Sequence, residues 1–88
     1  MDEKENYLKL LSEIIAKQIV ILGPNIAVLK ARNVPELTVG DDGKVTDLKG
    51  DPNVALQKLV DEYVNLSGLI VKNALDSIFM KYPSIKKV

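Results

Sequence analysis

The chain has 88 residues, no formal net charge, and neither cysteine nor histidine. This length predicts a single helical domain over 1–88, with a hydrophobic core that is marginal for independent stability. The composition excludes disulfides, Cys/His zinc sites and catalysis by a Ser-His or Cys-His pair within the chain. Association is the reinforcement that remains available to so small a domain.

The charges also bear on partners and location. All but one of the twelve basic residues are lysines, Arg32 being the exception, and no basic stripe typical of a nucleic-acid binder is present. No apolar run approaches the length of a membrane span, and the acidic start lacks a signal-peptide pattern. We therefore expect a cytoplasmic protein that binds neither nucleic acid nor membranes.

The first predicted element is a helix over about 2–22. Its apolar residues recur at steps of three and four, and Glu5–Lys9 and Glu13–Lys17 form i,i+4 pairs on the opposite face, which we interpret as solvated. The apolar residues are Leu8, Leu11, Ile14, Ile15, Ile19 and Leu22. Gly23-Pro24 then interrupts the pattern and predicts a second, short helix over about 24–33.

A β-hairpin is predicted next, over about 36–48. Leu37 and Val39 alternate with polar residues, and Asp42-Gly43 lies between β-forming segments, which is a hairpin signal. An isolated hairpin is marginal in water, so we expect this one to pack on the helices or to pair with its copy in another subunit.

The last predicted element is one long helix over about 52–82, roughly 46 Å in length. Asp51-Pro52 is a strong start, since Asp caps a helix and Pro fits its first turn. Its apolar half-circle includes Leu56, Leu59, Val60, Tyr63, Val64, Ile70, Val71, Ala74, Leu75 and Ile78. The pair Ser67-Gly68 is a possible kink, so the pattern leaves open whether the helix is continuous.

The extent of this apolar half-circle is the main functional clue in the sequence. It predicts a dimeric helical bundle in which two long helices pack together, although a monomer shielded by its own first two helices stays open. The residues expected at the seam are Leu56, Leu59, Tyr63, Ile70, Ala74 and Ile78, with Phe79 and Met80 at an interface edge.

Gln18 lies in the middle of the apolar arc of the first helix. A buried amide without partners costs about 1–3 kcal/mol, so it needs an explanation. We expect a hydrogen bond to a backbone carbonyl freed by the Gly23-Pro24 break. The alternatives are a polar residue that sets the register of an oligomer seam, and a contact to a ligand.

These patterns favour a small self-associating interaction or regulatory module without catalytic activity, whose partner is a second copy and, alternatively, another protein. The second hypothesis is a small-ligand sensor with a pocket between the first and last helices, near Gln18 and Tyr63. We predict no cofactor and no metal.

An enzyme is the third hypothesis. Asp41, Asp42, Asp47 and Asp51 surround the hairpin, but their spacing does not match a calcium loop, and turn formation or capping explains Asp42 and Asp51. Ser77 and Lys81 are spaced like a Ser-Lys pair, a spacing that is common by chance.

Overall fold

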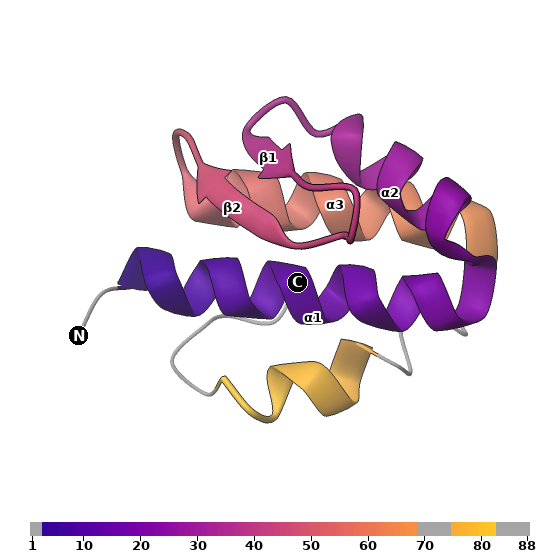
Figure 1. Cartoon of the computed structure of the whole chain (residues 1–88). Coiled ribbons are helices and arrows are strands. Elements are labelled where there is room, and N and C mark those ends of the chain that lie inside the picture. Colours follow the sequence, from indigo (N-terminus) through magenta and orange to yellow (C-terminus); the bar gives the residue numbers. More distant parts are fainter. Residues whose placement is uncertain (1–2, 69–74, 83–88) are drawn as a thin grey trace.

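The computed structural model describes residues 3–68 and 75–82. Helix α1 (Glu3–Leu22) is followed by helix α2 (Pro24–Arg32), strands β1 (Leu37–Val39) and β2 (Val45–Leu48), and helix α3 (Pro52–Ser67); residues 75–79 are helical again. The first two helices and the hairpin confirm the sequence predictions. Figure 1 shows α1 crossing the molecule, with α2 and the hairpin on one side and the segment 75–79 on the other.

Local chemistry sets the element boundaries. Gly23 adopts φ +90°, and Pro24 opens α2, so the chain turns sharply and α2 runs back along α1 (Figure 1). At the start of α3 the Asp51 carboxylate accepts a hydrogen bond from the Asn53 backbone N–H at 2.9 Å, with Pro52 next in the chain. The predicted cap of this helix is therefore confirmed.

The hairpin is antiparallel and contains an irregularity between Thr38 and Val39. Gly43 takes φ +84° in the turn, where the backbone N–H of Lys44 donates to the Asp42 carboxylate at 3.0 Å. The hairpin packs on the helices: the backbone N–H of Val45 donates to the Ser12 hydroxyl on α1 at 3.0 Å. The prediction that the hairpin is supported by helices thus holds within a single chain.

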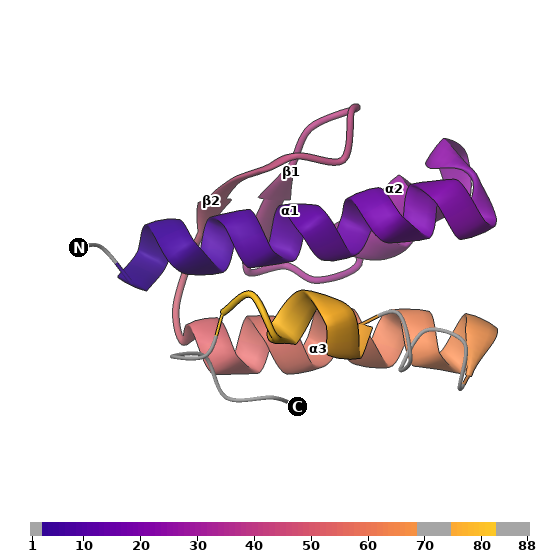
Figure 2. The ribbon, with the colours of Figure 1, turned by 90° about the horizontal axis from the view of Figure 1, so that it is seen from below.

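The single long helix predicted over 52–82 is not formed, and of the two possibilities that the sequence leaves open at Ser67-Gly68 the interruption is the one observed. Helix α3 ends at Ser67, and Gly68 follows with φ +61° and ψ −131°, while its N–H donates to the Val64 carbonyl at 2.8 Å. Only glycine adopts such a backbone conformation readily. The segment 75–79 then lies beside α1 rather than extending α3 (Figure 1), and Figure 2 shows α1 and α3 running in the same direction with this segment in front of α3.

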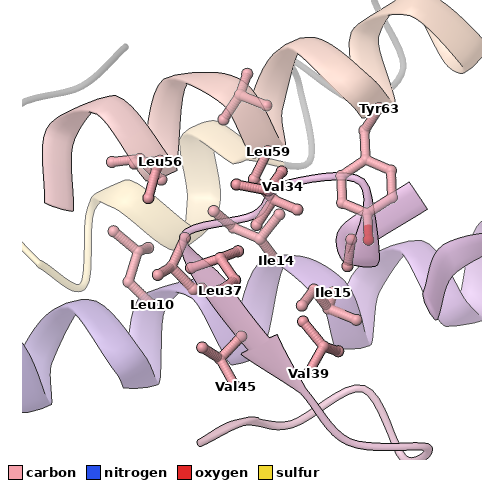
Figure 3. Packing of buried hydrophobic residues seen from close by; sticks show 14 of the residues in the cluster. Leu10, Ile14, Ile15, Val34, Leu37, Val39, Val45, Leu56, Leu59 and Tyr63 are labelled. Atoms are coloured by element: carbon pink, nitrogen blue, oxygen red, sulfur yellow. The ribbon is translucent and has the colours of Figure 1, made fainter. Parts of the chain in front are cut away.

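One apolar core joins all these elements. Leu10, Ile14 and Ile15 of α1 meet Leu56, Leu59 and Tyr63 of α3, and the strands contribute Val39 and Val45 (Figure 3). Leu75, Ile78 and Phe79 are buried in the same cluster. Folding back at Gly68 therefore lets the chain itself cover much of the apolar face of its C-terminal third.

Candidate functional site

The residues predicted for the seam lie inside the chain's own core. Leu56, Leu59, Tyr63 and Ile78 are fully buried, and Phe79 is almost fully buried. Met80 is 83% exposed, and Ile70 and Ala74 lie outside the described residues. Leu56, Leu59, Tyr63, Ile78 and Phe79 are therefore not available to a partner of the folded chain, whereas Met80 is.

Tyr63 has a structural role in this core. Its hydroxyl donates to the Ala27 carbonyl of α2 at 2.7 Å, which ties α3 to α2. Burial, with a smaller contribution from the neighbouring Glu62 carboxylate, raises the pKa of Tyr63 far above its usual value. A fully buried phenol engaged in this way is not available to a ligand.

Gln18 is completely buried, as its place in the apolar arc predicts. Its side-chain oxygen and nitrogen make no hydrogen bond with the described residues, so the expected bond to a backbone carbonyl near Gly23 is not formed. The Gly23 N–H itself donates to the Ile19 carbonyl at 2.9 Å. Neither Gln18 nor Tyr63 lines either of the two cavities described below.

A groove with a volume of about 550 Å³ lies between α1 and β2. We call it the α1–β2 groove. It is lined by Glu5, Leu8, Lys9, Ser12, Glu13, Lys44, Val45, Thr46 and Tyr82. Its volume lies within the usual range of small-molecule sites.

The floor of this groove is fixed by contacts between its two walls. The Ser12 hydroxyl donates to the Leu8 carbonyl at 2.7 Å and accepts from the Val45 N–H at 3.0 Å, so α1 and β2 hold a defined separation. Tyr82 closes one side, and its pKa is raised by burial and by the adjacent Glu13 carboxylate. Glu13 Oε2 is shielded from solvent and lies 3.8 Å from Lys81 Nζ.

The sequence does not predict this groove, because Glu5, Lys9 and Glu13 belong to the α1 face that the i,i+4 pairs predict to be solvated, and Lys44 lies far away in the sequence, just before β2. Glu13 forms an ion pair with Lys81 of the C-terminal segment instead of Lys17. Glu5, Lys9 and Lys44 form no ion pair with the described residues. Only the fold reveals that these charges converge on an apolar floor.

A second surface lies on the outward side of α2. Ile26 and Leu29 are 47% and 62% exposed and three residues apart, so they lie on one side of the helix. A shallow cavity of about 350 Å³ continues beside them. We call this surface the α2 face; it comprises Pro24, Asn25, Ile26, Leu29, Arg32 and Asp41.

The hairpin aspartates serve structural roles. Asp41 pairs with Arg32 at 2.7 Å, and Asp47 pairs with Lys4 at 2.9 Å, which together with a backbone hydrogen bond lowers the pKa of Asp47. Among residues 3–68 and 75–82, no group of three acidic side chains is arranged to hold a metal ion. Nor is any helix within those ranges long and apolar enough to cross a lipid bilayer.

Comparison of this chain with protein families, curated proteins and solved structures found no match.

Proposed function

We propose that this chain is a small, non-catalytic interaction module that associates with a second copy of itself through the α2 face. The observation that carries the proposal is the exposure of Ile26 and Leu29 side by side on a helix whose opposite side, including Ala27 and Ala31, is fully buried. Burying such side chains against a partner removes apolar surface from water and favours association.

The charges of the α2 face suit a second copy. Arg32 and Asp41 carry opposite signs and pair with each other at 2.7 Å at one border of the face, so this border presents no uncompensated charge to a second copy. The zero formal net charge of the chain adds no overall repulsion between copies.

The proposed dimer is weak. Two large, half-exposed side chains form a small interface core, which is typical of transient contacts and of dissociation constants on the order of 10 μM to 1 mM. Such an interaction would respond to the local concentration of the protein, as expected of a regulatory module.

Sedimentation equilibrium between about 10 μM and 1 mM tests this proposal. We expect a rise in average mass with concentration, and loss of that rise in the double variant Ile26→Glu/Leu29→Glu, whose charges would be desolvated in the interface. The matched control is Met80→Glu, a single change at another exposed apolar residue, which directly follows the helical segment 75–79. Thermal melts check that each variant is folded.

Two outcomes would overturn the proposal. A monomer at every concentration would exclude self-association and leave a different protein as the occupant of the α2 face. A dimer that is weakened by Met80→Glu but not by the double variant would place the interface on the C-terminal segment instead.

A second function, binding of a small ligand, is favoured by the α1–β2 groove. The groove combines an apolar floor with converging polar groups, the usual composition of a ligand site. It lies between α1 and β2, at Ser12, Glu13 and Tyr82, whereas the ligand-sensor hypothesis expected a pocket between the first and last helices at Gln18 and Tyr63.

A further inference from the structure

We infer that the α1–β2 groove binds a short zwitterionic peptide of about two residues. This inference rests on the second proposed function, ligand binding in the groove, and gives that function a ligand class. Three features of the groove support it: the signs of the lining charges, their spacing along α1, and the apolar part of the lining.

The signs of the charges select the ligand's charge. The groove is lined by two carboxylates, Glu5 and Glu13, and by two ammonium groups, Lys9 and Lys44. A ligand with only one kind of charge would be repelled by one pair, whereas a zwitterion can approach both. Of these four groups, the only one with an ion pair among the described residues is Glu13, and its pair with Lys81 is long, at 3.8 Å.

The spacing of the charges selects the ligand's length. Glu5, Lys9 and Glu13 follow each other at four-residue steps on α1, which correspond to a rise of about 6 Å each. An extended chain advances about 3.3–3.6 Å per residue, so the two termini of a dipeptide are separated by a similar distance. A single amino acid, whose charged groups share one carbon atom, is too short to contact neighbouring positions of opposite sign.

The floor selects the ligand's side chains. Leu8, Val45 and the ring of Tyr82 supply the apolar part of the lining. Such a floor favours apolar or aromatic side chains, which gain from leaving water. The volume of about 550 Å³ equals the liquid volume of roughly 18 water molecules, which is sufficient for a dipeptide with one aromatic residue.

The probe is the dipeptide Leu-Phe, titrated into the full chain and followed by amide chemical shifts in NMR spectra. We expect saturable shifts at Leu8, Ser12 and Val45 with a dissociation constant in about the millimolar range, because the groove is open. N-acetyl-Leu-Phe and Leu-Phe-amide should each bind about three- to tenfold more weakly, since each lacks one terminal charge in a partly solvated site.

Variants of the groove show which charged residue binds each terminus of the dipeptide. Glu13→Gln should remove the preference for a free amino terminus, and Lys44→Gln should weaken the preference for a free carboxylate. Lys17→Gln, at an exposed lysine of α1 that does not line the groove, is the matched control and should leave both preferences unchanged.

Two results would overturn the inference, and they differ in what they say about the second function. If the blocked peptides bind as well as the free dipeptide, the groove binds ligands but does not select zwitterions. If no probe shifts the groove residues at about 10 mM, ligand binding in the groove fails as well. The average mass of the same samples in sedimentation equilibrium tests self-association through the α2 face, independently of ligand binding in the groove.

Discussion

At the scale of single residues, Gln18 is the least favourable side chain in the core. It is fully buried, yet its amide makes no hydrogen bond with the described residues. Its burial could be predicted from the sequence, because the helical period places it between Leu11 and Leu22. Its lack of a partner could not be predicted, since hydrogen bonding depends on which groups the fold brings within about 3 Å.

We predict that Gln18→Leu raises the free energy of unfolding by about 1–3 kcal/mol, because it removes the cost of an unsatisfied buried amide while conserving most of the volume. Urea denaturation measures the change. The control is Gln57→Leu at an exposed position of α3, for which we expect a change within about 0.5 kcal/mol. A lower stability of Gln18→Leu would contradict the prediction and indicate that the amide is hydrogen-bonded in solution.

At the scale of secondary structure, short local signals predicted most boundaries. These signals act through their own backbone or capping geometry, so they do not depend on tertiary packing. They are Gly23-Pro24, Asp42-Gly43 and Asp51-Pro52. The end of α3 was not predictable in this way. The helical spacing of apolar residues continues past Gly68. That spacing is compatible both with one long helix and with two shorter helices that fold back on each other.

The hairpin turn shows how closely an element depends on its neighbour. Gly43 has φ +84°, and a Cβ atom there would lie 2.8 Å from atoms of both Ile15 and Ile19 on α1. Gly50 has a similar φ, +77°, but a Cβ atom there would meet nothing within 4 Å. A comparison of substitutions at Gly43 and Gly50 therefore separates the cost of backbone strain from the cost of steric conflict.

We predict that Gly50→Ala costs about 1–2 kcal/mol, the price of a left-handed backbone for an L-residue. Gly43→Ala should cost about 2–5 kcal/mol, because overpacking against Ile15 and Ile19 adds roughly 1–3 kcal/mol. Chemical denaturation of both variants checks the difference. Equal losses would show that the hairpin moves away from α1 without cost, and that its packing on this helix contributes little stability.

At the scale of the whole molecule, the sequence predicted the class of fold and one domain, but placed its functional surfaces elsewhere. The apolar face of 52–82 predicts a partner only if this segment forms one long rod that the first two helices do not cover. Once the chain folds back, Leu56, Tyr63 and Ile78 belong to the core. The charges Glu5 and Lys44, unremarkable in the sequence, then gain a role because tertiary packing sets them around one groove.

The conformation of Gly68 decides between these two arrangements. At φ +61° and ψ −131°, an alanine would be strained, whereas in a continuous helix it would be favourable by about 1 kcal/mol over glycine. Gly68→Ala should therefore weaken the folded-back form and favour the long helix. In that form Leu75, Ile78 and Phe79 would leave the core of their own chain, and exchange with a second copy is the way to bury them again.

We predict that Gly68→Ala increases the helical signal at 222 nm in circular dichroism and shifts the sedimentation mass toward a dimer, because exchange restores the lost apolar contacts between chains. Gly23→Ala is the matched control: φ is also positive there, at +90°, and a Cβ atom would meet nothing, but Pro24 disfavours a helical conformation at position 23. The control should lose stability without gaining helix or mass. If Gly68→Ala behaves in the same way as Gly23→Ala, the contacts of the C-terminal segment, rather than the backbone of Gly68, maintain the folded-back arrangement.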